Sequence, residues 1–208
     1  FNEVLAHEVR RASRYGSQLS LLILDLDDFK RVNDTCGHVE GDSMLRRVGR
    51  MLRDNTRQTD SVCRYGGDEF AVLLPETSSA EAFILAERIR KSQLRVGRGA
   101  SDDPKVRFTP TVLSAMGSTP AGDRDLGAAG GGVSGGGVSG GGGDTPHEGP
   151  RDGSWFLTSS IGGATYPTHC DEAEELVALA DQMCLDAKRL GKNQVRRRGG
   201  RGLSMAAE

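Results

Sequence analysis

The sequence lacks a long apolar run, a paired cysteine motif and a sizeable net charge. No stretch of its 208 residues approaches the ~18 apolar residues that a membrane-spanning helix needs, and no signal peptide stands at its start. Its four cysteines contain no Cys-x-x-Cys pair, which argues against a zinc knuckle or a disulfide framework. The formal net charge of -2 gives no general reason to expect nucleic acid as a partner.

These absences favour a domain that works in the reducing cytoplasm. The length suits one ordinary domain, or one domain with an insertion. Because the sequence starts at Phe1 instead of Met, we expect a piece of a longer protein, whose upstream part is the place for a sensor domain or a membrane anchor. The basic run Arg196–Arg198 is a local exception to the charge balance, and we interpret it as a solvated tail.

Glycine is concentrated in residues 130–143, which read GGGVSGGGVSGGGG. Such a repeat has almost nothing to bury, so packing cannot offset its chain entropy. It also lacks the strand and helix that flank a phosphate-binding loop. The expected organisation is therefore one domain in two parts, 1–96 and 154–198, a mostly disordered insertion, 97–153, and a tail, 199–208.

The apolar periodicity predicts an α+β fold. Helical spacing predicts helices over residues 2–15, 44–52, 82–89 and 171–190. Short apolar or alternating runs bounded by turn residues predict strands over 19–26, 61–65, 70–74, 155–166 and 194–196. Gly66-Gly67-Asp68-Glu69 separates two of these strands as in a β-hairpin, where we expect glycine to supply positive φ. The hairpin makes part of the sheet antiparallel, so we predict a central, mostly antiparallel sheet surrounded by helices.

Acidic residues lie at the end of the first predicted strand and at the tip of the hairpin. If these elements pair, Asp25, Asp68 and Glu69 converge at one end of the sheet. Hard oxygen ligands suit Mg²⁺, which commonly uses one or two carboxylates together with water and substrate phosphates. Two such ions can activate an attacking hydroxyl and stabilise a leaving pyrophosphate. The pattern alone indicates metal-dependent phosphate chemistry, with a surface turn of incidental acids as the alternative.

A series of motifs runs in order along the chain. They are Asp25–Asp42 (DLDDFKRVNDTCGHVEGD), Arg64–Phe70 (RYGGDEF), Ser160-Ile161-Gly162, Ala180-Asp181 and Ala187-Lys188-x-x-Gly191-x-Asn193. The second contains the signature of the GGDEF family of diguanylate cyclases, and the first resembles that family's D-x-D-x-F-K-x-x-N-D-x-x-G-H-x-x-G-D motif. The resemblance covers nearly everything except the insertion and the tail. It implies that two GTP molecules are condensed into cyclic di-GMP and two pyrophosphates across a homodimer, with Mg²⁺ or Mn²⁺ as cofactor.

The resemblance also implies roles for single residues. The metal ligands would be Asp25, the backbone carbonyl of Leu26, Asp68 and Glu69. Asp68 and Glu69 are also the expected catalytic residues, because one of them would help to deprotonate the ribose 3′-hydroxyl that attacks the other GTP. The residues expected to contact phosphates are Lys30, Lys188 and Lys192. The family usually has arginine at the last position, and lysine there keeps the charge but loses the fork.

Asn33 and Asp42 resemble the pair that reads the base. A carboxylate accepts hydrogen bonds from N1–H and the 2-amino group of guanine, which adenine does not offer, so the site should reject ATP. His38 lies in the loop beside the nucleotide, where we favour a positioning role over that of a general base. Gly66 and Gly67 would let the backbone pass close to the nucleotide.

A second site follows from the R-x-x-D sequence Arg57–Asp60. Its offset from the signature resembles the inhibitory site at which the family binds its product, cyclic di-GMP. Arginine suits this task because its planar fork binds phosphate bidentately and stacks on guanine. Arg88 resembles an arginine that completes the site from a neighbouring protomer. The alternative is an ordinary ion pair at a helix end.

Two other functions compete with the enzyme. One is a receptor that binds cyclic di-GMP at Arg57 and Asp60 and signals by protein contact. The other is a regulatory module that binds GTP. Receptors of this kind usually have a damaged signature, and Arg64–Phe70 is intact. The sequence therefore favours the cyclase.

Overall fold

The structure is a computed structural model that describes residues 1–92, 94–96 and 155–199. The expected insertion, 97–153, and the expected tail beyond Gly199 lie outside the described residues. No helix among the described residues is long and apolar enough to cross a membrane.

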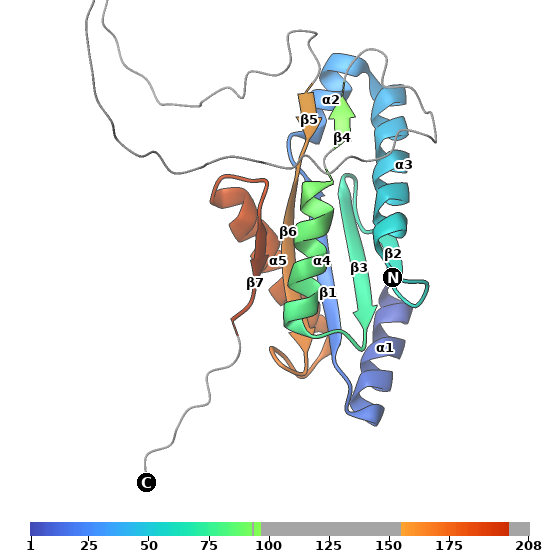
Figure 1. The fold of residues 1–208 in the computed structure, drawn as a ribbon, viewed down its shortest axis with the longest axis vertical. Coiled ribbons are helices and arrows are strands. Elements are labelled where there is room, and N and C mark those ends of the chain that lie inside the picture. Colours follow the sequence, from blue (N-terminus) through green and yellow to red (C-terminus); the bar gives the residue numbers. More distant parts are fainter. Residues whose placement is uncertain (93, 97–154, 200–208) are drawn as a thin grey trace, which may run out of the picture. The chain divides into compact units, whose positions relative to one another are not determined.

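A five-stranded mixed sheet forms the centre of the fold (Figure 1). Its strands, in the order β2-β3-β1-β6-β7, are β2 (Ser61–Arg64), β3 (Glu69–Pro75), β1 (Leu19–Leu26), β6 (Ser159–Tyr166) and β7 (Val195–Arg197). Neighbours are antiparallel except for β6 and β7, which are parallel. Two short strands, β4 (Leu94–Val96) and β5 (Trp155–Leu157), pair with each other. The described helices are α1 (Asn2–Tyr15), α2 (Phe29–Cys36), α3 (His38–Asn55), α4 (Ser79–Lys91) and α5 (Ala173–Arg189). The predicted α+β fold with a mostly antiparallel sheet is confirmed.

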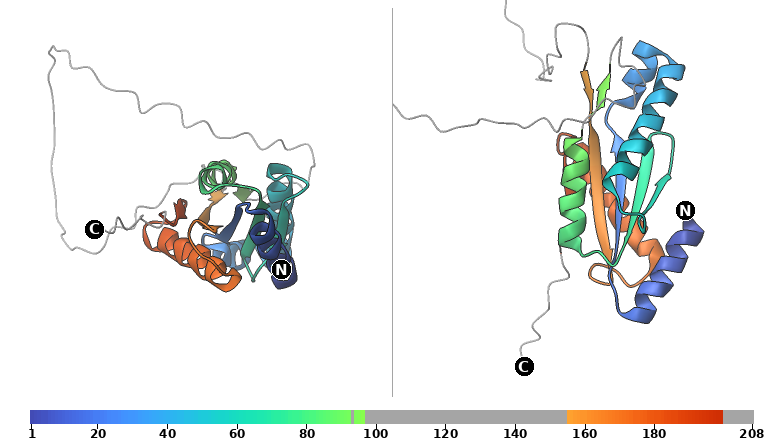
Figure 2. Two further views of the ribbon diagram at one scale, coloured as in Figure 1. Left: turned by 90° about the horizontal axis from the view of Figure 1, so that it is seen from below. Right: turned by 45° about the vertical axis from the view of Figure 1, so that its right-hand side comes forward.

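Strand β1 is the central strand, and all of its residues are buried. It reads as a nearly continuous apolar run because helices cover both faces of the sheet (Figure 2). Leu22 and Leu24 pack on one face with residues of α2, α3 and α4. Leu21 and Ile23 point to the other face, toward α1 and α5. The alternation of side chains along one strand thus builds both cores.

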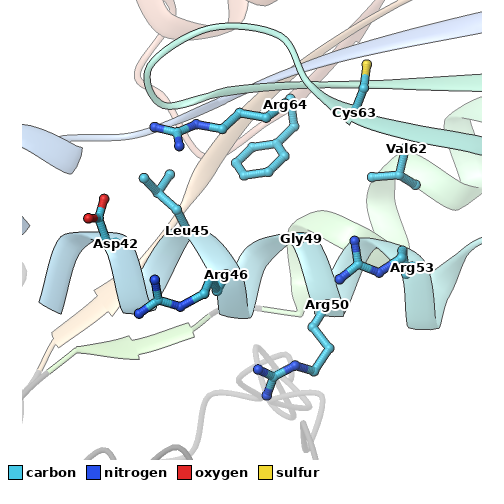
Figure 3. A pocket seen from close by; sticks show the side chains of 10 residues that line it. Asp42, Leu45, Arg46, Gly49, Arg50, Arg53, Val62, Cys63 and Arg64 are labelled. Atoms are coloured by element: carbon cyan, nitrogen blue, oxygen red, sulfur yellow. The ribbon is translucent and has the colours of Figure 1, made fainter. Parts of the chain in front are cut away.

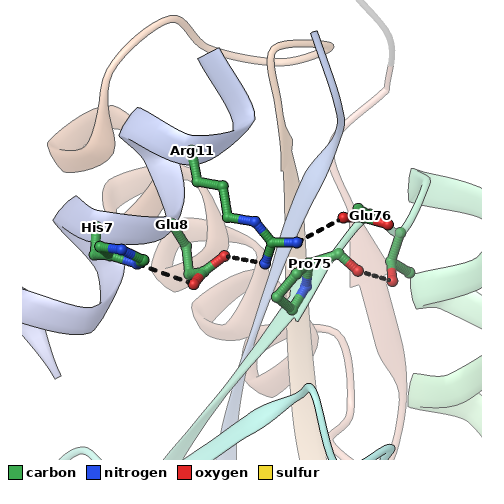
Figure 4. A network of polar contacts seen from close by, with 6 residues as sticks. His7, Glu8, Arg11, Pro75 and Glu76 are labelled. Atoms are coloured by element: carbon green, nitrogen blue, oxygen red, sulfur yellow. Dashed lines mark hydrogen bonds and ion pairs between the residues drawn. The ribbon is translucent and has the colours of Figure 1, made fainter. Parts of the chain in front are cut away.

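The turn between β3 and α4 is fixed at both of its ends. Ser78 caps α4, and its side chain forms a capping box with Glu81. Glu76 forms an ion pair with Arg11 of α1 at 2.8 Å, and Arg11 forms a second one with Glu8 at 3.4 Å (Figure 4). These contacts attach α1 to the turn, although exposed pairs of this kind contribute little to stability.

Two helix boundaries differ from the sequence expectation. Helix α2 was not predicted, and α3 begins at His38, six residues before the predicted start. The segment between Asn33 and Asp42 is polar, so the apolar periodicity that marks a helix is too weak there to be recognised. Gly37, with φ of 85°, separates the two helices.

Candidate active site

The end of β1 and the signature hairpin meet as predicted. Asp25, the penultimate residue of β1, lies opposite Glu69 at the start of β3. The backbone N–H of Leu26 donates to the carbonyl oxygen of Asp68 at 3.2 Å. The antiparallel pairing of β1 with β3 therefore brings the four proposed metal ligands to one end of the sheet.

Asp25 is the most perturbed carboxyl group at this end. Its side chain is almost fully buried, and burial raises its pKa to about 6. Lys188 of α5 forms an ion pair with it and opposes the rise, whereas the charges of Asp68 and Glu69 add to it. At neutral pH Asp25 is therefore mostly ionised, beside one cation and two further carboxylates.

The donor set suits a hard divalent cation whose coordination is completed by other molecules. Asp25, Asp68 and Glu69 offer oxygen atoms only, and the backbone carbonyl of Leu26 is adjacent. Among the described residues, no three His, Cys, Asp or Glu side chains are already grouped to hold a metal ion. The chemistry of these oxygen donors fits a hard divalent ion such as Mg²⁺, which keeps several positions for water and substrate phosphates.

The loop after α5 brings Lys192, another of the predicted residues, to this end of the sheet. Lys192 donates to Asp28 at 2.7 Å, at the start of α2. The neighbouring backbone N–H of Asn193 donates to the carboxylate of Asp27 at 3.0 Å. Lys188 and Lys192 are thus held near β1 by the acidic run at its end. Lys30, the third predicted phosphate contact, is exposed on α2.

Asp27, which lies in the first motif, links several segments at this end of the sheet. Its buried carboxylate accepts hydrogen bonds from the hydroxyls of Thr158 and Ser160, both at 2.7 Å, and from Asn193. The acid therefore connects β1 to β6 and to the loop of Lys192. Ser160 belongs to a recognised motif, but Thr158 carried no signal in the sequence.

The proposed base-reading residues come from two adjacent helices. Asn33 lies on α2 and Asp42 on the first turns of α3, while His38 is exposed at the start of α3. A Cβ atom at Gly41 would collide with the side-chain oxygen of Asn33, so glycine there allows the two helices to approach. Asp42 stands at one end of a pocket between α3 and the hairpin strands, with a volume of about 540 Å³ (Figure 3).

The hairpin does not use its glycines as expected. The expectation that these glycines supply positive φ was wrong, because neither Gly66 nor Gly67 has a positive φ angle. A two-residue turn would require such angles, but residues 65–68 form a longer loop between the strands. Instead the side chain of Arg64 donates to the carbonyl oxygen of Gly67 at 2.6 and 3.0 Å and to that of Gly66 at 3.2 Å. The first arginine of the signature therefore fixes the loop.

The predicted inhibitory residues line a second pocket, of about 240 Å³. One oxygen of the Asp60 carboxylate accepts from the backbone N–H of Arg57 at 2.7 Å. The other oxygen is buried without a hydrogen-bond partner among the described residues. Arg88 of α4 donates to the carbonyl oxygen of Asn55 and faces the same pocket. Arg88 of the same chain therefore lines the pocket together with Arg57 and Asp60, and its role in completing the site of a neighbouring protomer stays a prediction.

The chain is similar to one family and to several known proteins. Residues 1–109 match the family described as "Diguanylate cyclase, GGDEF domain". The chain is 34% identical over 192 residues to diguanylate cyclase DosC of Escherichia coli (strain K12), which covers 92% of this chain and 31% of DosC. It is 49% identical over 82 residues to the response regulator PleD of Caulobacter vibrioides, which covers 39% of this chain and 18% of PleD. The chain thus spans about a third or less of the length of these curated relatives.

Solved structures show the same fold. The GGDEF domain of YfiN (TpbB) from Pseudomonas aeruginosa is similar with a TM-score of 0.63 and 26% identity, over 95% of this chain and 92% of that one. Diguanylate cyclase SiaD from the same organism, in complex with its activator SiaC, is similar with a TM-score of 0.64 and 27% identity, over 94% and 56% of the two chains. The hairpin and the end of β1 lie inside the family match.

Proposed function

Because this chain belongs to the GGDEF-domain family of diguanylate cyclases, we propose that it condenses two GTP molecules into cyclic di-GMP and two pyrophosphates. The observation that carries the proposal is the meeting of Asp25, Asp68 and Glu69 at one end of the sheet. Carboxylates gathered beside lysines suit a reaction that needs both metal ions and phosphate contacts.

The chemistry is a nucleotidyl transfer that occurs twice. A 3′-oxygen forms a bond to the α-phosphorus of the other GTP, and the bond from that phosphorus to the β-phosphate bridge breaks. Mg²⁺ or Mn²⁺ held by the carboxylates and the Leu26 carbonyl would neutralise charge on the phosphates and lower the pKa of the attacking hydroxyl. Asp68 or Glu69 accepts the proton of this hydroxyl. Asp68 stands on the hairpin loop that Arg64 fixes, and Glu69 follows it as the first residue of β3.

The lysines around this end of the sheet balance the charge of the triphosphate. Lys188 and Lys192 lie beside Asp25 and Asp28, and Lys30 is exposed on α2. When a triphosphate binds, its oxygens compete with these carboxylates for the ammonium groups. Lysine supplies a point charge with three donors, so it can exchange one anion for another without a fixed geometry.

Asn33 and Asp42 read the guanine, and His38 positions the loop between their helices. Asp42 accepts hydrogen bonds from N1–H and the 2-amino group, so ATP would leave this carboxylate without donors. The backbone at Gly66 and Gly67 lies close to the nucleotide.

Each protomer supplies one GTP, so the active form is a homodimer. The parts 1–96 and 154–198 form one cytoplasmic catalytic domain, and an upstream sensor domain regulates the dimer.

Product inhibition occurs in the pocket of Arg57, Asp60 and Arg88, where two guanidinium groups face the phosphates of cyclic di-GMP. The oxygen of Asp60 that has no hydrogen-bond partner among the described residues would accept from a base N–H of this ligand.

The test is synthesis of cyclic di-GMP by the full chain with GTP and Mg²⁺, with and without a fused dimerising coiled coil. Asp68→Ala should abolish product formation without lowering the melting temperature, because Leu26 bonds to the backbone of this residue and not to its side chain. Asp54→Ala is a matched control, since Asp54 is an exposed acid on α3. Wild-type turnover by Asp68→Ala would exclude its metal role. Tight binding of cyclic di-GMP without any synthesis would favour the receptor.

A further inference from the structure

Arg46 shares one face of α3 with Asp42. The two residues are four positions apart, which is about one turn or 6 Å along the helix axis. Helical side chains lean toward the N-terminus, so the side chain of Arg46 extends over the turn that carries Asp42. Both residues are exposed and line the same pocket, and Figure 3 shows the side chain of Arg46 extending toward the end of the helix that carries Asp42.

The arginines of this pocket differ in what they contact. The guanidinium of Arg64 is engaged by the carbonyl oxygens of the hairpin loop. Within the part of the chain that the structure describes, the side chains of Arg46, Arg50 and Arg53 make no hydrogen bond or ion pair. Of these three pocket residues, only Arg46 is a single helical turn from Asp42. An acceptor and a bidentate donor therefore lie side by side in one pocket, each available to a ligand.

We propose that Arg46 is a specificity-determining residue that donates to O6 and N7 of guanine while Asp42 accepts from N1–H and the 2-amino group. The inference rests on the proposed function. Guanine presents O6 and N7 as two adjacent acceptors, and a bidentate arginine is the commonest protein partner of this edge. The two edges adjoin on one ring, as Arg46 and Asp42 adjoin on one helix face. The floor beside them is apolar, with Leu45 and Phe70 in the lining, which suits a planar base.

Asp42 and Arg46 would distinguish guanine from adenine in two separate ways, the first through Asp42 and the second through Arg46. Adenine fails the first because it lacks the N–H donors that Asp42 needs. It fails the second because its 6-amino group is a donor, which opposes the guanidinium of Arg46. Rejection of ATP therefore cannot tell the two residues apart, whereas analogues that change only one edge can.

The test uses 7-deaza-GTP, in which N7 is replaced by a C–H group, and ITP, which lacks only the 2-amino group. Affinity is measured by calorimetry on the full chain, together with the KM and kcat of synthesis. Wild-type protein should bind 7-deaza-GTP about tenfold more weakly than GTP. Arg46→Ala should weaken GTP binding to a similar extent and bind both nucleotides equally, while its preference for GTP over ITP persists. Arg46→Lys should behave like Arg46→Ala, because it keeps the charge and loses the fork.

Arg53→Ala is the matched control. Arg53 is exposed on the same helix and has the same charge, but it lies about 10 Å further along the axis from Arg46. It should leave the ratio of GTP to 7-deaza-GTP affinity unchanged. Equal wild-type affinity for the two nucleotides, or equal losses in Arg46→Ala and Arg53→Ala, would overturn the proposal. The binding measurement does not depend on turnover, so failure of the cyclase reaction remains distinguishable from failure of the Arg46 contact.

Discussion

Helix α5 packs closely against Gly162 of β6, and replacing this glycine with alanine tests the packing. An added Cβ would lie 2.8 Å from Cα of Cys184 and closer still to the carbonyl oxygen of Ala180 and the backbone nitrogen of Cys184. These are backbone atoms of α5, so no side-chain rotation can relieve the collision. Ordinary van der Waals contact begins at 3.4 Å. The helix must therefore move by roughly 1 Å, which loosens the contacts that a close-packed interface depends on.

The neighbouring glycine provides the control. A Cβ at Gly163 points to the other face and meets Cδ2 of Leu22 at 3.0 Å, the flexible end of a side chain. Both substitutions reduce the entropy of the unfolded chain equally, so this effect cancels between them. We expect Gly162→Ala to lose about 3 kcal/mol of unfolding free energy, the upper part of the usual range for overpacking. Gly163→Ala should stay within about 1 kcal/mol of wild type.

Thermal and urea unfolding of the full chain, followed by circular dichroism, measure this difference. A loss of 3 kcal/mol corresponds to a melting temperature lower by about 6–12 °C for a chain of this size. Helix α5 also carries Lys188, so the displaced helix should weaken GTP binding in Gly162→Ala more than in Gly163→Ala. Equal stabilities of the two variants would refute the packing argument.

Two further predictions concern single side chains. Arg57→Ala should raise synthesis at high concentrations of cyclic di-GMP because the pocket loses a phosphate-binding fork, and unchanged product inhibition in initial-rate assays would contradict the inhibitory role. Burial raises the pKa of Asp25 to about 6, so the folded protein binds this proton more tightly than the unfolded chain does. Its contribution to stability is fully present below about pH 4 and is lost as the pH rises through 6. Without divalent metal, the unfolding free energy of the wild type should therefore fall more between pH 5 and pH 7 than that of Asp25→Asn. Urea unfolding measures both values, and an equal fall in the two proteins would contradict this prediction.

The main sheet was largely predictable because its strands have strong local patterns. Leu19–Leu26 is apolar except at Ser20 and Asp25 and matches the predicted strand, and Ser78 carries a capping box that marks the start of α4. Helix α2 could not be found in the same way, because its eight residues bury only Phe29 and Val32. Such a short helix depends on its contact with α3, which no local window of sequence reveals.

The site was predictable in its residues but not in its connections. The motif spacing placed Asp25 near Asp68 and Glu69, and β1–β3 pairing brings them together. The loop geometry of Gly66 was missed because it depends on hydrogen bonds from Arg64. The hydrogen bond from the hydroxyl of Thr158 to the carboxylate of Asp27 joins residues that are 131 positions apart in the sequence. Contacts of this kind follow from the fold as a whole and not from local sequence.

The most direct test of the cyclase assignment is turnover of GTP against ATP by the full chain fused to a constitutive dimeriser, with Mg²⁺ present. Cyclic di-GMP and pyrophosphate are quantified together over the time course. We expect two pyrophosphates for each cyclic di-GMP from GTP and no cyclic product from ATP. No product from GTP, or equal turnover of ATP, would contradict it.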